Sequence, residues 1–425
     1  MEIYFLIILI LSLLTNLIIY KNILNPTVII RLTWIFSVFM LILFRELWGV
    51  SLSGATMLIF IVGFFFFDLG YMSFHFFSSN HKNKKLTNKN KVSFRKSLII
   101  LFLLIVGFII IYYISYNLVV AYRNNETSGN FLIRLRYLMK YSNVNTSLIQ
   151  FGIRMIETIG IVYFIYYIRE ENKSFKSKVI YLSIIFLSLI MMSINTGRFR
   201  YLAFIVMTIY IIGLKFIKNN KTINLKSQFK IIAIGIIMFI IFIIFFQTYG
   251  VFLGKGFGGL INNLAIYSSG GIVAFDLRWQ DISKTSSYFG QAIFNPVYSQ
   301  LENFFDLSFE TNKKIGVLKS VYANNEFATN VYTFYRQQII DFGVKAVPII
   351  MFVLGAFFSY LNYKSFRENE LGFWSALYAY FMFGIIISPF QDVFFTNTTF
   401  DLISIIIIFL MLKTKILYKK NIVQN

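Results

Sequence analysis

The chain contains no cysteine, only two histidines, and 18 acidic residues against 40 basic ones. The absence of cysteine excludes disulfide bonds and every metal site that depends on thiolate ligands. His75 and His81 lie close together, at the end of one apolar run and in the basic segment that follows it. Because histidine is the usual general base and metal ligand, chemistry elsewhere in the chain must use other residue types. We therefore expect neither a metal site nor a cofactor.

Apolar residues are abundant: they make up 57% of the 425 residues, and the mean hydropathy is +0.69. A bilayer span needs about 20 mostly apolar residues, and runs of this length and uniformity exclude barrel strands. The sequence predicts an all-α polytopic membrane protein, with residues 1–425 as a single integral membrane domain of about eleven spans or twelve. The predicted spans begin near Glu2, Thr27, Leu52, Ser97, Thr146, Val179, Tyr201, Phe229, Val344, Gly372 and Leu402.

The net charge of +22 is concentrated in alternate connections between the apolar runs, at residues 82–96, 169–178, 215–230 and 413–420. Positive charge of this kind faces the cytoplasm, so the N-terminus is expected outside and the C-terminus in the cytoplasm. The bilayer is therefore the expected partner of the basic residues, and nucleic acid is not. The expected outer segments are residues 45–50, 121–145, 195–200, 251–341 and 389–401.

Residues 251–341 form one large extracytoplasmic loop between the eighth and ninth predicted spans. Connections longer than about 15 residues are usually functional or disordered, and the Tyr, Phe and Trp content of this one argues against disorder. It has no strand-like alternation. We expect it to fold partly as helices that lie on the outer surface.

Four charged residues fall inside predicted spans, namely Arg31, Asp68, Arg154 and Glu157. Arg154 and Glu157 are three positions apart on one helix face, which predicts a structural ion pair. Arg31 and Asp68 lie near span ends, where we expect each side chain to snorkel towards the interface.

Several arginines fall on the expected outer side: Arg198 and Arg200 in a short turn, Arg278 and Arg336 in the large loop, and Arg123 in an earlier loop. A guanidinium binds phosphate oxygens through two parallel hydrogen bonds and keeps its charge. These arginines therefore indicate an anionic lipid-linked ligand, with a diphosphate as the candidate. For Arg198 we favour this interpretation, since the positive-inside bias disfavours arginine in so short an outer turn.

The alternative is that outer arginines only contact lipid headgroups. We favour that alternative for Arg134 and Arg136, which lie in an amphipathic stretch suited to the interface. Carboxylates on the same side offer candidate general bases, but their spacing does not select one, and Asp276 could simply pair with Arg278. These carboxylates are Asp276, Asp281, Glu302, Asp306, Glu310, Glu326 and Asp341.

Four motifs give the chain a family resemblance. They are NTGRFRYL at residues 195–202, YSSGGIVAFD at 267–276, FGQAIFNPVYSQL at 289–301 and NVYTFYRQQIIDFG at 330–343. In this order and on this side of the membrane, they resemble Wzy-type oligosaccharide repeat-unit polymerases of bacterial O-antigen or capsule assembly. The resemblance extends over most of the chain, although family members often have twelve spans with both ends inside.

The resemblance implies a polymerase of the bacterial inner membrane. It would join two polyprenyl-diphosphate-linked oligosaccharides, one as donor and one as acceptor, with inversion and release of polyprenyl diphosphate. A chain-length regulator protein is a further partner to consider. Combined with the positions of the arginines, the resemblance implies catalytic roles for Arg198, Arg278, Arg336 and Asp276. It implies substrate-binding roles for Arg200, Tyr267, Arg123, Trp279, Asn330, Tyr332 and Asp341.

Three other functions compete with this one. An O-antigen ligase carries an important histidine in its large outer loop, and this chain has no histidine there. A flippase or other transporter of lipid-linked oligosaccharides would tend to show repeated halves and polar sites at mid-membrane, and no convincing repeat is present. A structural or sensing membrane protein would not need several outer arginines beside aromatic loops. The polymerase is therefore the favoured hypothesis.

Overall fold

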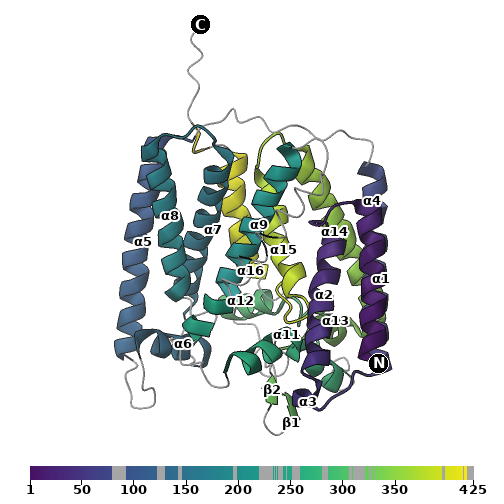
Figure 1. The fold of residues 1–425 in the computed structure, drawn as a ribbon. Coiled ribbons are helices and arrows are strands. Elements are labelled where there is room, and N and C mark those ends of the chain that lie inside the picture. Colours follow the sequence, from purple (N-terminus) through teal and green to yellow (C-terminus); the bar gives the residue numbers. More distant parts are fainter. Residues whose placement is uncertain are drawn as a thin grey trace. The chain divides into compact units, whose positions relative to one another are not determined.

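A computed structural model of the chain describes most of its residues, and Figure 1 gives the arrangement of the helices. The described residues are 1–78, 92–121, 130–141, 146–194, 199–219, scattered positions in 233–250, 259–279, 286–305, 309, 321–324, 327–329, 331–394, 398–414 and 416–418. The helices up to the large loop are α1 (Glu2–Tyr20), α2 (Pro26–Leu43), α3 (Arg45–Trp48), α4 (Gly54–Ser78), α5 (Phe94–Ala121), α6 (Phe131–Tyr141), α7 (Ser147–Arg169), α8 (Phe175–Ile194) and α9 (Phe199–Asn219). The later elements are α11 (Gly259–Arg278), α12 (Asn295–Phe305), β1 (Val321–Asn324), β2 (Phe327–Thr329), α13 (Tyr335–Phe342), η1 (Val344–Ala346), α14 (Val347–Arg367), α15 (Phe373–Ile387), α16 (Thr398–Ile408) and η2 (Phe409–Lys413).

Eight of the described helices are long and apolar enough to cross a membrane, which confirms an all-α, membrane-embedded protein. They span Glu2–Tyr20, Pro26–Leu43, Gly54–Phe74, Phe94–Ala121, Ser147–Arg169, Phe175–Ile194, Phe199–Asn219 and Val344–Arg367. Each begins within about four residues of a predicted span, inside the usual uncertainty of such boundaries. The shorter helices α15 and α16 match the last two predicted spans, whereas the run near Phe229 lies largely outside the described residues. Any span beyond the eight remains a prediction.

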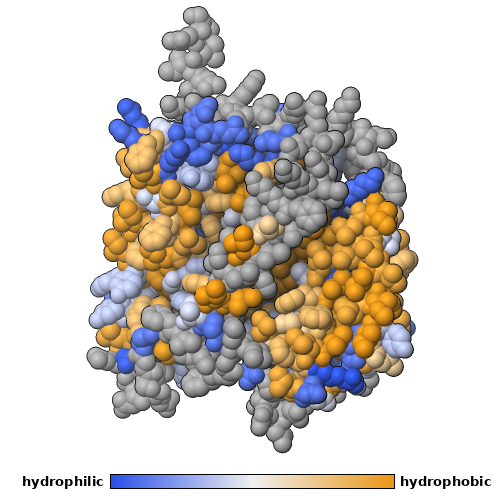
Figure 2. All heavy atoms as spheres, viewed as in Figure 1, coloured by the Kyte–Doolittle hydropathy of each residue, from blue (hydrophilic) through white to orange (hydrophobic). Residues whose placement is uncertain are grey.

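The outward faces of the long helices are apolar, as lipid contact requires. In α1 and α5 large side chains such as Leu11, Ile18, Phe102 and Ile109 are exposed. Figure 2 shows hydrophobic side chains along the lengths of such helices and hydrophilic ones gathered near helix ends. This distribution is the inverse of that of a water-soluble bundle, and it supports a bilayer as the solvent of these helices.

The chain divides into two compact units, each assembled from segments far apart in sequence. The first unit comprises Met1–Lys82, Gly258–Tyr363 and Phe381–Thr399, and the second comprises Asn83–Phe257, Lys364–Tyr380 and Phe400–Asn425. In the first unit α2 packs against α1, α4 and α11, and in the second α7 packs against α5, α8 and α9.

The described parts of residues 251–341 are mostly helical, in agreement with the prediction of helices there. They contain α11, α12 and α13, together with an antiparallel hairpin that was not predicted. In the hairpin Val321 pairs with Thr329 and Tyr322 with Ala328. Strands of four and three residues are too short to give a detectable alternation of polar and apolar side chains, which explains why the sequence did not predict them.

Side-chain hydrogen bonds join the helix ends of the first unit that were predicted to share one membrane face. The Glu2 carboxylate accepts from the backbone N–H of Leu52 at 2.8 Å, and the Trp48 indole N–H donates to Ser269 at 3.0 Å. The first contact connects the start of α1 with the segment before α4, and the second connects α3 with α11. The arrangement agrees with the predicted sharing of a face, while the side of the membrane that this face meets remains a prediction.

The prediction that Arg31 and Asp68 snorkel independently is wrong. Arg31 is only 1% exposed, and its guanidinium forms an ion pair with the Asp68 carboxylate. It also donates to the hydroxyl of Ser12 at 3.0 Å and to the carbonyl oxygen of Phe64 at 3.2 Å. The reason is that α2 lies between α1 and α4, so that three helices meet at this guanidinium and its charge is balanced inside the unit.

In the second unit, the predicted pair Arg154–Glu157 is present, with nitrogen and oxygen 3.5 Å apart. The structure adds partners that the sequence did not suggest. Arg154 also forms an ion pair with Asp401 of α16 at 3.1 Å, and the phenol of Tyr380 on α15 contacts both Arg154 and Asp401. This polar cluster joins α7, α15 and α16, because a charge in lipid surroundings is tolerated only with partners.

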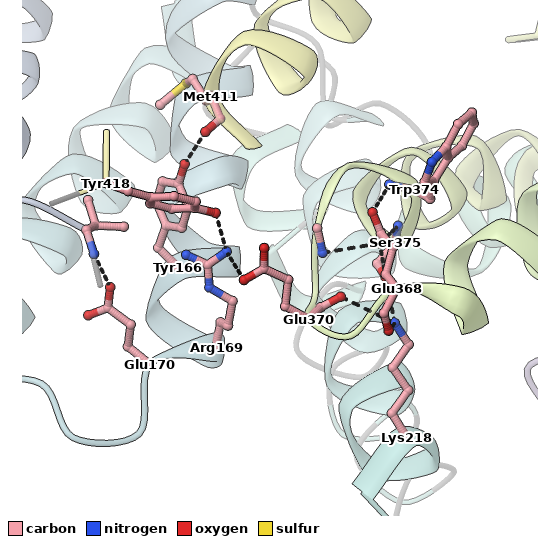
Figure 3. A network of polar contacts seen from close by, with 12 residues as sticks. Tyr166, Arg169, Glu170, Lys218, Glu368, Glu370, Trp374, Ser375, Met411 and Tyr418 are labelled. Carbon is pink, nitrogen blue, oxygen red and sulfur yellow. Dashed lines mark hydrogen bonds and ion pairs between the residues drawn. The ribbon is translucent and has the colours of Figure 1, made fainter. Parts of the chain in front are cut away.

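A second polar network lies at the ends of α7, α9 and α15 (Figure 3). Arg169 donates to Glu370 at 3.3 Å and to the Tyr418 hydroxyl at 2.6 Å, and its guanidinium lies over the rings of Tyr166 and Tyr418. The Lys218 ammonium donates to the Ser375 hydroxyl at 3.1 Å. Thus Arg169 and Lys218, which were counted in the sequence among the basic residues that set topology, form hydrogen bonds inside the protein.

The Arg31–Asp68 pair allows a test of this packing. Arg31→Met should destabilise the protein by about 3–5 kcal/mol, because it leaves the Asp68 carboxylate without its cation. Thermal unfolding in detergent, followed by tryptophan fluorescence, measures the loss. The double variant Arg31→Met/Asp68→Leu should recover most of it. A single variant as stable as the wild type would show that the two charges are not buried together.

Candidate functional site

The candidate site lies in the first unit, where the end of α11 meets the segment that leads into α13 (Figure 1). Two adjacent glycines bring α11 close to its neighbours. A methyl carbon at Gly270 would lie 3.0 Å from the Thr329 hydroxyl, and one at Gly271 would lie 3.0 Å from the Cα of Phe390. Only a residue without a side chain permits such approach, so this glycine pair fixes the position of the helix that ends at Arg278.

A buried tyrosine anchors α13. Tyr335, the first residue of the helix, is fully buried, and its ring presses against Gly63 of α4. Its ring centroid lies 5.2 Å from that of Phe60 and 5.9 Å from that of Trp34. This aromatic packing holds the start of α13 against α2 and α4, and thereby determines where the next residue, Arg336, lies.

Two arginines act on one buried phenol. The guanidinium carbon of Arg336 lies 4.8 Å from the ring centroid of Tyr332, which packs against Ala274 of α11. Burial raises the pKa of Tyr332, and the charges of Arg336 and Arg278 oppose that rise. Burial also lowers the pKa of Arg336, although a guanidinium stays charged at neutral pH. Arg336 therefore places a positive charge against the ring of Tyr332, and the charge of Arg278 acts on the same phenol.

Around Arg336 several polar atoms lack hydrogen-bond partners among the residues that the structure describes. The Nε of Arg336 is one of them, and both Thr333 and Gln338 are fully buried. The others are Thr333 Oγ1, the Tyr335 hydroxyl oxygen, Gln337 Oε1 and both terminal side-chain atoms of Gln338. A buried polar group without a partner costs about 1–3 kcal/mol, so six such atoms on six consecutive residues mark a place where hydrogen bonds to a ligand or to water are available.

Asp276 is engaged in structural hydrogen bonds. Its carboxylate accepts from the backbone N–H and the hydroxyl of Ser53, at 3.1 Å and 2.7 Å, just before α4 begins. Among the described residues no ion pair joins it to Arg278. The carboxylate therefore ties α11 to the start of α4. Arg278 itself, at the end of the same helix, is exposed, and Trp279 is half-buried.

Asp341 is likewise held by the backbone. Its two carboxylate oxygens accept from the N–H groups of Ala292 and Ile293, each at 2.8 Å. Burial raises the pKa of Asp341, and these two hydrogen bonds oppose the rise. Because both oxygens are occupied by backbone donors, the geometry favours a supporting role for Asp341 over the substrate-binding role that the sequence suggested.

The remaining predicted site residues are dispersed. Tyr267 of α11 is half-buried, with its ring centroid 5.4 Å from that of Phe390. Arg200 is half-buried at the start of α9, in the second unit. Arg198, Arg123 and Asn330 lie outside the described residues. The structure thus brings Arg336 together with Tyr332, while Arg278 acts on Tyr332 through its charge.

Sequence reasoning missed Thr333, Gln337 and Gln338. The available signal was the run of polar side chains in YTFYRQQ, which is unusual immediately before an apolar span. Among the described residues, no group of three or more His, Asp or Glu side chains is placed to hold a metal ion. The arrangement therefore offers two guanidinium groups, buried amides and a hydroxyl, which suit an anionic and hydroxyl-rich ligand.

Comparisons of the chain with protein-family models, with curated proteins and with solved structures found no match.

The role of Asp341 can be tested directly. Asp341→Asn should loosen the turn at residues 286–294, because an amide supplies one acceptor oxygen where the carboxylate supplies two. Loss of one buried hydrogen bond, worth about 1–2 kcal/mol, should raise local opening roughly 5- to 30-fold. Limited proteolysis in detergent, with the cut sites mapped by mass spectrometry, measures it. Glu46→Gln, at an exposed carboxylate, is the control. Equal cleavage rates for Asp341→Asn and the wild type would contradict the assigned role.

Proposed function

We propose that the protein is a Wzy-type polymerase that joins oligosaccharide repeat units at the outer face of a bacterial cytoplasmic membrane. In this proposal both donor and acceptor are linked to polyprenyl diphosphate. The terminal hydroxyl of one glycan attacks the anomeric carbon of the other, and the bond from that carbon to the diphosphate oxygen breaks. A single displacement of this kind inverts the anomeric configuration, and the hydroxyl proton passes to the aqueous outer face.

The observation that carries the proposal is the placement of Arg336, whose guanidinium carbon lies 4.8 Å from the ring centroid of Tyr332 and whose Nε is buried without a partner among the described residues. The charge of Arg278 acts on the same phenol. A departing diphosphate develops negative charge. Guanidinium groups already held in place stabilise that charge without reorganisation. Because the leaving group is activated, the enzyme needs chiefly to position the substrates and to stabilise this charge.

The apolar helices support the membrane part of the proposal. Polyprenyl chains are as apolar as lipid tails, so a lipid-linked substrate reaches the site from within the bilayer. The site is formed by the end of α11 and the start of α13. Both segments belong to the large loop that the positive-inside pattern assigns to the outer side. Lipid-linked donors at that face would meet Arg336 and Arg278 at headgroup level.

The first test concerns Arg336. Arg336→Ala should lower polymerisation about a hundredfold, because loss of one preorganised charge-stabilising contact costs roughly 3 kcal/mol. Arg336→Lys should recover little, since an ammonium group cannot form the paired hydrogen bonds of a guanidinium. Arg278→Ala should act in the same direction. The measurement is the amount and length of polymer on a gel, from cells that express each variant at matched levels.

Arg45→Ala is the matched control for these variants, because Arg45 is exposed in the same unit and belongs to a segment expected on the same membrane face. It should leave the polymer unchanged. If Arg336→Ala and Arg278→Ala both made full-length polymer in normal amounts, the proposed role of the arginines would be wrong.

Arg198, which lies outside the described residues, remains a sequence-based prediction within this proposal. Its position in the short turn of NTGRFRYL suits contact with a lipid diphosphate. Arg198→Ala should abolish polymerisation while membrane insertion stays normal, and Arg198→Lys should restore little of it. Polymer analysis as above, with Arg134→Ala as the interfacial control, decides the matter. Full-length polymer from Arg198→Ala would remove Arg198 from the proposed site.

A further inference from the structure

Four aromatic side chains of the large loop and the last residue of α13 form a cluster that we call the aromatic platform: Tyr288, Phe289, Tyr298, Phe309 and Phe342. The ring centroids of Tyr298 and Phe309 lie 5.1 Å apart, and those of Tyr288 and Phe309 lie 5.2 Å apart. Phe289 packs on Phe342 at 5.0 Å. Phe289 is nevertheless 79% exposed, and Tyr288 is 45% exposed. The platform thus presents ring faces on the surface of the first unit.

The platform is held rigidly. The Tyr298 hydroxyl donates to the carbonyl oxygen of Phe289 at 2.7 Å, and the Gln291 side chain bridges Ser287 and Phe309. Gly290 adopts a positive φ of 66°, a conformation that favours glycine and that turns the chain directly after Phe289. An exposed ring fixed in this way loses little further entropy when it binds a partner.

The platform shares helix α13 with the candidate site. Phe342 ends α13, the helix that carries Arg336 six residues earlier, which corresponds to a rise of about 9 Å. A glycan whose diphosphate lay at Arg336 would extend over this surface. Rings suit such a partner, because the apolar face of a sugar presents C–H groups to the negative face of an aromatic ring and the phenol hydroxyls can accept or donate to sugar hydroxyls.

We propose that the aromatic platform binds sugar rings of the glycan chain beside the candidate site and thereby retains the growing polymer between additions. The proposal rests on the proposed polymerase function. A glycan chain that stays bound to these aromatic rings receives another repeat unit more often before it is released. Loss of the platform should therefore shorten the polymer, which is a different outcome from the loss of synthesis expected of the arginine variants.

The test compares three substitutions at Phe289. Phe289→Ala and Phe289→Leu should both shift the polymer to shorter modal lengths, whereas Phe289→Trp should keep the wild-type length because it retains a ring. Leucine preserves apolar character without a ring, so it separates stacking on sugars from anchoring in lipid. Purified variants in detergent should bind fragments of the host's own polymer, prepared by partial hydrolysis, about three- to tenfold more weakly when the ring is absent.

Phe175→Ala is the control, because Phe175 is 81% exposed but belongs to the second unit, at a segment expected in the cytoplasm. It should change neither length nor binding. Wild-type polymer lengths and wild-type fragment binding for Phe289→Leu would overturn the platform. So would short polymer for Phe289→Ala together with wild-type length for Phe289→Leu, since that result identifies apolar anchoring in lipid and not stacking on sugars. If the wild-type protein made no polymer while fragments still bound, the polymerase function would fail and the glycan surface would stand.

Discussion

The buried ion pair between Arg31 and Asp68 is the interaction on which the geometry of the first unit depends. It lies where α1, α2 and α4 meet, and both charges would be very costly in lipid without each other. The guanidinium carbon of Arg31 also lies 4.6 Å above the ring of Phe64, which neighbours the Tyr335 ring at 6.4 Å. Through this sequence of contacts a charge pair inside the helices fixes the start of α13, and so the position of Arg336.

The second arginine of the site is fixed from the other direction. Asp276 holds the end of α11 to Ser53, and the two glycines let the body of α11 approach Thr329 and Phe390 closely. Arg278 and Arg336 are far apart in sequence, yet each follows an anchored residue of its helix: Asp276 in α11 and Tyr335 in α13. Groups positioned by rigid packing stabilise developing charge without reorganisation, which is why anchoring matters more here than the number of charges.

Hydropathy predicted the helices well, because runs of about 20 apolar residues in a membrane protein have few other structures available. The three-residue spacing of Arg154 and Glu157 predicted their ion pair, since the two residues share one helix face. The sequence did not predict that Asp401 joins this pair, or that Arg31 meets Asp68, because the periodicity of a single helix does not say which other helices pack against it. The hairpin was missed because its strands are too short to show alternation, and the unpartnered atoms of Gln337 and Gln338 were missed because burial is not visible in the sequence.

In the second unit, buried basic residues hold helix ends together. Arg169 and Lys218 appear in the sequence as part of the basic excess that sets topology, but both are buried and held by Glu370, Tyr418 and Ser375. These two cations, with their nearby acceptors, join the helix ends at which they lie. Arg336 contrasts with them, because among the described residues it has a ring beneath it and no carboxylate within ion-pair distance. A half-buried guanidinium that keeps its charge, and that no carboxylate of the described residues neutralises, is suited to meet an anion supplied by a substrate.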